Sequence, residues 1–287
     1  MNLKLQVTVA LLVSSIAFFS CGENQTNDNE TGTAQTAATD ATAPVSVKED
    51  SVTYTADGKT MKSYIAYNES DSSARPVVLV VPEWWGLNDY PRSRAKQLAQ
   101  MGYTAMAVDM YGNGTIAANP QEAMNLTKPF YGNPALFLSR VNAALAKLKE
   151  YKQADLTNAA AIGYCFGGSA VLNAAKLGAD LKGVVSFHGG LAGAPVDKDL
   201  LKAKILVCHG GADSFVPPAE VAAFKKSMDS IGADYQFKVY PDATHAFTNP
   251  EATATGKKFD MPITYNAAAD SASWNDMKAF FGQIFPK

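Results

Sequence analysis

The feature that most constrains this chain is a glycine-flanked cysteine, Cys165, that directly follows the apolar run of residues 159–162. The sequence Gly-Tyr-Cys-Phe-Gly-Gly over residues 163–168 predicts a buried strand that breaks sharply into a helix. The N-terminus of that helix, expected over residues 166–177, points at the sulfur and favours the thiolate. The layout is that of a nucleophile elbow with cysteine in place of serine. The alternative is a buried core cysteine in a glycine-rich turn.

Apolar runs and helical patterns alternate from residue 52 onward. The pattern predicts strands at residues 52–56, 61–67, 76–81, 103–109, 159–164, 183–187, 205–209 and 235–240. It predicts helices at residues 91–101, 134–151, 166–177, 218–231 and 267–285. The first two strands flank the turn signal Asp57-Gly58 and are expected to pair antiparallel. The remaining alternation predicts an α/β fold with a mostly parallel central sheet and helices on both faces.

Three chemically reactive side chains each follow a different predicted strand: Cys165, Asp213 and His245. The carboxyl ends of parallel strands meet at one edge of a sheet, so these side chains are expected to lie close together. Their order along the chain is that of the α/β-hydrolase triad. We therefore expect Cys165 to attack a carbonyl carbon, His245 to transfer protons and Asp213 to orient the imidazole. Asp213 could instead cap the helix that begins near Pro217.

An attack on a carbonyl also needs hydrogen-bond donors for the oxyanion. We expect the backbone N–H groups of Phe166 and Trp84 to supply them, because Phe166 follows the nucleophile and Trp84 follows the strand at residues 76–81. Glu83 precedes two tryptophans after that strand, and a carboxylate there is costly without a partner. We expect it to face the cysteine; a surface position in the loop is the alternative.

The chain has three histidines. His188 also follows a strand and could border the site, whereas His209 is expected to serve only in backbone hydrogen bonding. Asp242 has the character of a turn residue, although it lies near His245. Three scattered histidines without a ligand spacing argue against a metal site, and the expected chemistry needs no cofactor.

The N-terminal residues indicate export. An apolar run over residues 5–19 follows Lys4 and precedes Ser20-Cys21-Gly22, so residues 1–20 are predicted to be a signal peptide. Cys21 resembles the acylated cysteine of a bacterial lipoprotein; an ordinary cleaved signal peptide is the alternative. Residues 21–47 are polar and poor in large apolar side chains, which predicts a flexible tether. The catalytic domain is expected over residues 48–287, at the bacterial cell envelope and held to a membrane only through the lipid.

Composition narrows the classes of function. The formal net charge is −2, and without a basic cluster there is no case for nucleic-acid binding. With 3 cysteines the chain is not a disulfide scaffold. A small-molecule substrate and a monomer are expected.

Taken together, several motifs resemble the dienelactone hydrolase family. They are Glu83-Trp84-Trp85-Gly86-Leu87-Asn88, Asp109-Met110-Tyr111-Gly112, Gly163-Tyr164-Cys165-Phe166-Gly167-Gly168, His209-Gly210-Gly211-Ala212-Asp213, His245-Ala246-Phe247 and Tyr265-Asn266-Ala267-Ala268-Ala269. The resemblance covers about residues 50–287. It implies an α/β-hydrolase fold with the triad Cys165, Asp213 and His245. It also implies that Glu83 contacts the resting thiol and moves when substrate binds.

One departure from the family concerns the substrate. Members that act on dienelactone bind its carboxylate with arginines, one of them four residues after the catalytic histidine, where this chain has Asn249. Asparagine does not replace a guanidinium clamp, so dienelactone itself is doubtful as substrate. Four residues are expected to line the pocket: Trp85, Tyr111, His188 and Phe247.

The sequence thus predicts a hydrolase of small carboxylic esters or lactones. A ligand-binding lipoprotein that retains the fold without turnover is the main alternative, and a peptidase is another. A thiol redox sensor would need Cys208 within disulfide reach of Cys165.

Overall fold

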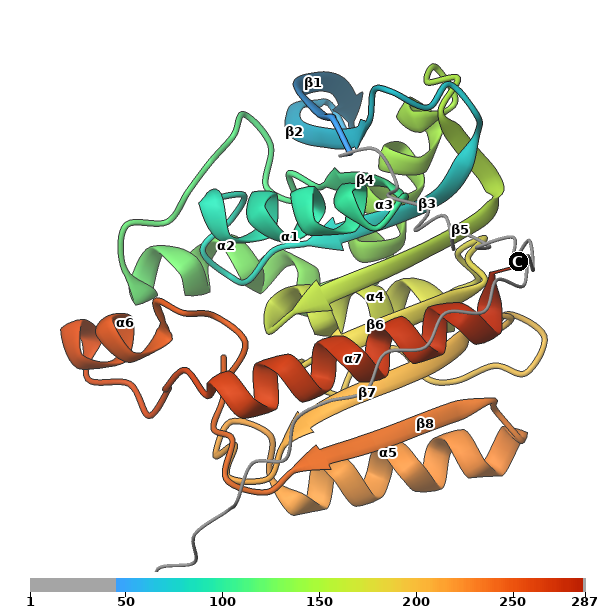
Figure 1. Cartoon of the computed structure of the whole chain (residues 1–287). Helices are drawn as coiled ribbons and strands as arrows, with labels where there is room; N and C mark the ends of the chain where they lie inside the picture. The colour runs from blue at the N-terminus through green and yellow to red at the C-terminus, as the bar shows by residue number, and fades with distance from the viewer. Residues whose placement is uncertain (1–44, 286–287) are drawn as a thin grey trace, which may run out of the picture. The chain divides into compact units, whose positions relative to one another are not determined.

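The computed structural model describes residues 45–285, and these form an eight-stranded sheet with helices on both faces (Figure 1). The predicted signal peptide, Cys21 and most of the tether lie outside the described residues. The strand order is β1-β2-β4-β3-β5-β6-β7-β8. The strands are β1 (Val47–Ala56), β2 (Lys59–Asn68), β3 (Arg75–Val81), β4 (Thr104–Ala107), β5 (Ala154–Tyr164), β6 (Gly183–Phe187), β7 (Lys204–Gly210) and β8 (Tyr235–Tyr240).

Strand directions follow the prediction. β1 pairs antiparallel with β2 and β2 antiparallel with β4, whereas β4, β3 and β5 to β8 pair in parallel. Every predicted strand is present; β4 is shorter than expected and β5 starts earlier. The mostly parallel α/β sheet predicted from the alternation of patterns is confirmed.

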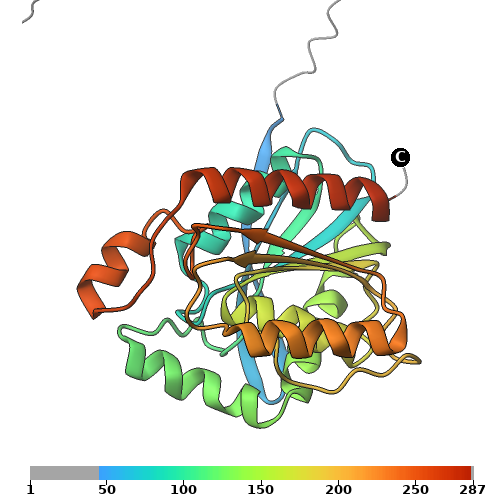
Figure 2. The same cartoon turned by 90° about the horizontal axis from the view of Figure 1, so that it is seen from below.

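Helices cover the two faces of this sheet. Figure 2 shows α7 on one side and α5 on the other. The helices are α1 (Asp89–Gln100), α2 (Pro120–Gly132), α3 (Ala135–Leu148), α4 (Phe166–Lys176), α5 (Pro218–Ile231), α6 (Ala252–Phe259) and α7 (Ala267–Ile284). Within residues 45–285, no helix is long and apolar enough to cross a membrane.

The central strand β3 shows how the sequence supplies both cores. Val77, Leu79 and Val81 pack with the cluster that includes α3, α4 and α5 side chains, whereas Val78 and Val80 pack with α1 and α7. Successive side chains of a strand point to opposite faces, so a strand buried on both faces needs an unbroken apolar run. That run is the Val/Leu segment recognised in the sequence.

Two helices were not predicted, α2 and α6. α2 begins with a capping arrangement: the Asn119 side chain accepts the N–H of Glu122, and the Glu122 carboxylate accepts the N–H of Ala118. The spacing Asn-Pro-Gln-Glu is a helix-start signal that the sequence contains. α6 has only 8 residues and therefore a weak periodic pattern.

The carboxyl ends of the parallel strands share one edge of the sheet, and the described chain begins and ends at the opposite edge. β1 runs parallel to β4 through their common partner β2, so Val47 lies at the edge where the parallel strands begin. Ile284, near the end of α7, lies beside Gly183 at the start of β6. The side chains beyond the carboxyl ends are therefore remote from both ends of the described chain.

Glycines allow α4 to pack against the central strands. A Cβ on Gly163 would lie 2.0 Å from the carbonyl oxygen of Gly167, and one on Gly167 would lie 2.2 Å from that of Val81. Real Cβ atoms do not approach backbone oxygens this closely, so both positions require glycine. The small residues around Cys165 are therefore a packing requirement of the turn from β5 to α4.

This packing predicts that Gly167→Ala lowers the free energy of unfolding by about 3 kcal/mol, because a backbone must move to admit the methyl group. Gly282→Ala is the matched control: that glycine lies on the exposed face of α7, and a Cβ added there would meet no atom within 4 Å. The control should be neutral or stabilising by up to about 1 kcal/mol. Urea unfolding of both variants checks this, and equal stabilities would contradict the packing argument.

Candidate active site

Cys165 sits at the tip of the turn between β5 and α4 in a backbone conformation rare for residues other than glycine, with φ 53° and ψ −115°. Its N–H is shared between the carbonyl oxygen of Phe187 at 3.0 Å and Nδ1 of His188 at 3.1 Å. Its own carbonyl accepts the N–H of Ser169 at 3.1 Å as α4 begins. Strained conformations of this kind persist only where surrounding contacts determine them, and they cluster at functional sites.

Asp213 and His245 form a direct hydrogen-bonded pair. Nδ1 of His245 lies 2.8 Å from Oδ2 of Asp213, whose side chain is fully buried. The other carboxylate oxygen of Asp213 accepts the N–H of Phe215 at 2.9 Å. The alternative role for Asp213 is contradicted, because the N-cap of α5 is Pro217 and no side chain caps the helix start.

The surroundings of His245 favour its protonated form. Burial alone would lower the pKa, but the neighbouring Cys165 sulfur and the Asp213 carboxylate raise the pKa of His245 to about 10. Cys165 and His245 line one cavity, and the ring of Phe215 lies 5.0 Å from the imidazole. The structure thus brings together the three residues that the sequence placed in a triad.

A cavity of ≈ 100 Å³ opens beside Cys165 and His245. Its wall is mostly apolar. It is lined by Glu83, Trp84, Trp85, Cys165, Phe215, His245, Ala246, Asn249, Ala252, Thr255, Met261 and Ile263. Its volume and wall suit a small, weakly polar group next to the sulfur.

Glu83 lies in this wall and is only 4% exposed. Its carboxylate accepts a hydrogen bond of 2.7 Å from the side-chain amide of Asn249. Burial raises the pKa of Glu83 to about 7, although the Asn249 contact and the nearby His245 and Arg94 charges act in the opposite direction. The surface alternative for Glu83 is wrong. Glu83 is hydrogen-bonded to Asn249, however, whereas the resemblance implied a contact with the Cys165 thiol.

Two further contacts shape the loop that carries Trp84. The carbonyl of Glu83 accepts the N–H of Gly86 at 3.1 Å, and in a trans peptide the N–H of Trp84 points the opposite way. The Tyr111 hydroxyl donates to the Trp84 carbonyl at 2.8 Å.

Phe166 is the first residue of α4, so its N–H has no acceptor within the helix.

Of the four residues expected to line the pocket, Trp85 does so and three do not. Tyr111 is buried behind Trp84 and acts on it through the hydrogen bond just described. Phe247 is fully buried against Tyr240 and His188. His188 lies beneath the elbow with its ring on Thr248. These three ring side chains were expected at the pocket surface because they lie next to site motifs, but they are buried in the core instead.

The remaining candidates stay outside the cavity. His209 packs against Phe237 of β8, with ring centroids 5.6 Å apart. Cys208 is buried on β7, and burial raises its pKa to about 12. Cys208 pairs with Phe187, which pairs in turn with Tyr164 beside Cys165, so two strand spacings of about 4.8 Å separate the cysteines. That separation exceeds disulfide reach and removes the support for a redox pair.

Most of the outer wall of the cavity was not predicted from the sequence. Ala252 and Thr255 come from α6, and Met261 and Ile263 come from the segment after it. Ile263 forms an isolated bridge with His245, which fixes that segment over the site. Phe215 follows Asp213 by two residues and was visible in the sequence as an apolar residue in a polar loop.

Comparison with known sequences decides the family. The sequence-family model described as the dienelactone hydrolase family matches residues 61–285 of this chain. The chain belongs to the dienelactone hydrolase family. The match spans the sheet from β2 to the end of α7, including every residue of the cavity wall.

Several family relatives cover most of the chain. Protein usf of Aquifex pyrophilus is 30% identical over 236 residues, which cover 80% of this chain and 96% of that protein. A protein of Methylorubrum extorquens, provisionally named carboxymethylenebutenolidase, is 29% identical over 220 residues and 72% of each chain. These matches make the protein a hydrolase of the dienelactone hydrolase type.

Solved structures agree. A dienelactone hydrolase-like promiscuous phosphotriesterase from metagenomic libraries has 33% sequence identity and a TM-score of 0.78, over 84% of this chain and 99% of that one. A dienelactone hydrolase from Klebsiella pneumoniae, provisionally so named, has 22% identity and a TM-score of 0.69, and shows the fold alone.

The buried Glu83 predicts a pH effect on stability. Because its pKa is raised to about 7 in the fold, it stabilises the protein below its ordinary pKa of 4.5, and this contribution is lost as the pH rises through 7. At about 1.4 kcal/mol per tenfold change in affinity for the proton, the loss amounts to about 3 kcal/mol. Glu83→Gln should therefore lose less stability than the wild type between pH 4.5 and 7.5 in urea unfolding. Glu251→Gln, at the exposed cap of α6, should behave as the wild type. Parallel curves for Glu83→Gln and the wild type would contradict the assignment.

Proposed function

We propose that this protein hydrolyses carboxylic ester or lactone bonds with Cys165 as nucleophile, His245 as proton carrier and Asp213 as the residue that orients His245. The observation that carries the proposal is the 2.8 Å bond between His245 and Asp213, together with the cavity that both His245 and Cys165 line. An oriented base beside a cysteine at the tip of a strand–helix turn is the arrangement that nucleophilic catalysis uses, and it supports this assignment of roles.

The reaction would proceed in two stages. In acylation, the Cys165 thiolate forms a C–S bond to the carbonyl carbon, and the N–H groups of Phe166 and Trp84 hold the oxyanion. The C–O bond to the alcohol then breaks, and the leaving oxygen takes the proton of the His245 imidazolium. In deacylation, His245 removes a proton from water, whose oxygen attacks the thioester. The carboxylic acid leaves, and the thiolate and imidazolium are restored.

The cavity wall supports small, uncharged acyl groups as substrates. The lining is mostly apolar, its volume is ≈ 100 Å³, and the lining residues include no arginine. Asn249, at the position where dienelactone-cleaving relatives have an arginine, is already engaged with Glu83. A carboxylate-bearing substrate such as dienelactone would meet the Glu83 carboxyl, and no arginine lines the wall to bind its carboxylate.

We also propose that the enzyme is exported and held at the bacterial cell envelope through a lipid on Cys21, as a monomer. The support is the apolar run of residues 5–19 followed by Ser20-Cys21-Gly22. β1 begins at the edge of the sheet opposite the cavity.

The second candidate function is ligand binding without turnover. The enclosed apolar cavity would suit it. A binding protein has no need for the oriented Asp213–His245 pair or for the strained backbone at Cys165, which costs about 1–3 kcal/mol. The site geometry therefore favours catalysis.

The proposed function predicts that the protein hydrolyses p-nitrophenyl acetate and small lactones and that Cys165→Ala loses the activity by at least about 10³-fold, because the nucleophile is removed. Cys208→Ala is the matched control, since Cys208 lies in the core away from the cavity. It should retain turnover when normalised to folded protein.

The assay separates the candidate functions. Equal rates for the wild type and Cys165→Ala would overturn the cysteine mechanism. No turnover by the folded wild type, together with binding of the same esters or lactones in calorimetry, would favour the ligand-binding function.

A further inference from the structure

We propose that His188 is a positioning residue that fixes the nucleophile Cys165 relative to His245 through a buried chain of hydrogen bonds. The inference rests on the proposed function and adds a residue to it that does not touch the substrate. His188 is 1% exposed and does not line the cavity, so it acts through the backbone of Cys165.

The hydrogen bonds of His188 fix where its proton lies. Nδ1 is 3.1 Å from the Cys165 N–H and must accept that hydrogen bond, so Nδ1 carries no proton. The proton of the neutral ring is then on Nε2, which donates to the hydroxyl of Thr248 at 2.7 Å. Burial first, and then the His245 and Arg94 charges, hold the pKa of His188 well below its ordinary value. The ring therefore stays neutral and keeps both contacts.

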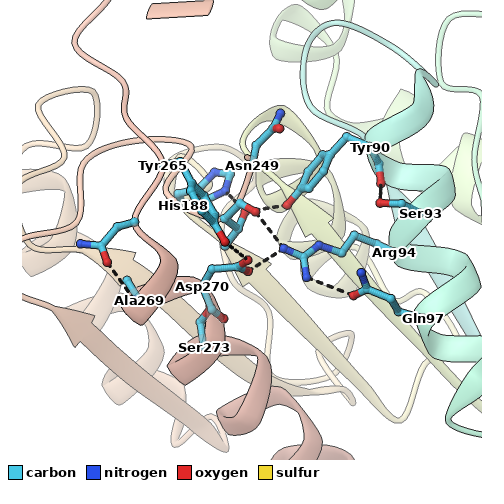
Figure 3. A network of polar contacts seen from close by, with 12 residues as sticks. Tyr90, Ser93, Arg94, Gln97, His188, Asn249, Tyr265, Ala269, Asp270 and Ser273 are labelled. Atoms are coloured by element: carbon cyan, nitrogen blue, oxygen red, sulfur yellow. Dashed lines mark hydrogen bonds and ion pairs between the residues drawn. The ribbon is translucent and has the colours of Figure 1, made fainter. Parts of the chain in front are cut away.

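Thr248 connects this ring to the loop that carries His245, three residues earlier in the chain. The Tyr90 hydroxyl donates to the Thr248 hydroxyl at 2.7 Å. Arg94 donates to the Thr248 carbonyl at 2.8 Å and to Asp270 at 2.5 Å. In Figure 3, Arg94 extends from α1 towards Asp270 of α7, with His188 and Tyr90 in the same network. Side chain and backbone of the loop are thus tied to two helices.

Backbone strain explains why such a chain is needed. Cys165, His188 and Ala246 all have positive φ, at 53°, 42° and 57°, although none is glycine. Cys165 lies in the turn between β5 and α4, His188 directly follows β6, and Ala246 directly follows His245. Residues persist in such conformations only where neighbouring contacts determine them, and the His188 chain links all three segments.

This arrangement controls the distance between the Cys165 sulfur and the His245 imidazole. The rings of His188 and His245 lie 5.3 Å apart, so the same side chain contacts the histidine from below and holds the Cys165 backbone. A displacement of about 1 Å in a catalytic group can cost about 10²-fold in rate. Loss of the His188 contact should therefore lower the rate of the chemical step more than the binding of substrate.

The test compares two substitutions that each keep one half of the ring's contacts. In His188→Asn the amide oxygen takes the place of Nδ1 and still accepts the Cys165 N–H. In His188→Gln the terminal amide takes the place of Nε2 and still reaches Thr248, but the acceptor for Cys165 is lost. We expect kcat per titratable thiol to fall by about 10- to 100-fold in His188→Gln and by less than about 5-fold in His188→Asn, with KM within about 3-fold in both.

Asparagine also tolerates left-handed backbone better than glutamine, so a second pair removes that difference. Thr248→Val deletes the hydroxyl that accepts from His188, and Thr248→Ser keeps it; Thr248 does not have a positive φ. We expect Thr248→Val to lower kcat and Thr248→Ser to retain it. Equal kcat per thiol within each pair would overturn the positioning role, even where the melting temperatures fall.

The rate at which iodoacetamide alkylates Cys165 at neutral pH keeps this test separate from the proposed function. If the wild type shows no cysteine-dependent hydrolysis, the proposed function fails, but alkylation still reports the pairing of Cys165 with His245. We expect His188→Gln to be alkylated at least about 5-fold more slowly than His188→Asn, because a displaced thiol loses its imidazolium partner. Equal alkylation rates would overturn the inference.

Discussion

The close approach of α4 to the central strands is the constraint on which the rest of this site depends. Gly163 and Gly167 leave no room for a side chain, so the turn between β5 and α4 must be tight, and its tip residue takes a positive φ. The turn places Cys165 in the cavity wall and the N–H of Phe166 at the open N-terminal end of the helix. Parallel strand order then brings the loops after β7 and β8, with Asp213 and His245, to the same edge.

Two imidazoles 5.3 Å apart have opposite pKa shifts, and their hydrogen bonds explain the difference. The Cys165 sulfur and the Asp213 carboxylate overcome the burial of His245 and raise its pKa to about 10. The ring nitrogens of His188 bond a backbone N–H and the Thr248 hydroxyl, and burial holds the pKa of His188 well below the ordinary value. One ring is suited to carry a proton and the other to remain a fixed neutral connector.

Local patterns in the sequence predicted what they determine directly. The unbroken Val/Leu run specified the buried strand β3, and residues just past strand ends specified Cys165, Asp213 and His245 because parallel strands end at one edge. Pocket lining was predicted poorly, since it depends on tertiary placement: Phe247 and Tyr111 turn into the core, while α6 supplies a wall from a short segment without clear periodicity. The Asn249–Glu83 contact joins positions 166 residues apart, and no local signal indicates it.

Formation of a covalent acyl-enzyme on Cys165 can be observed by mass spectrometry of enzyme quenched during turnover of p-nitrophenyl acetate. We expect an acetyl group on the peptide that contains Cys165, cleavable by hydroxylamine as a thioester, and an unmodified Cys208. Slower deacylation in Asp213→Asn should increase the acetylated fraction if acylation remains faster. An acetyl group on another residue, or turnover without any acetylated Cys165, would contradict the cysteine mechanism.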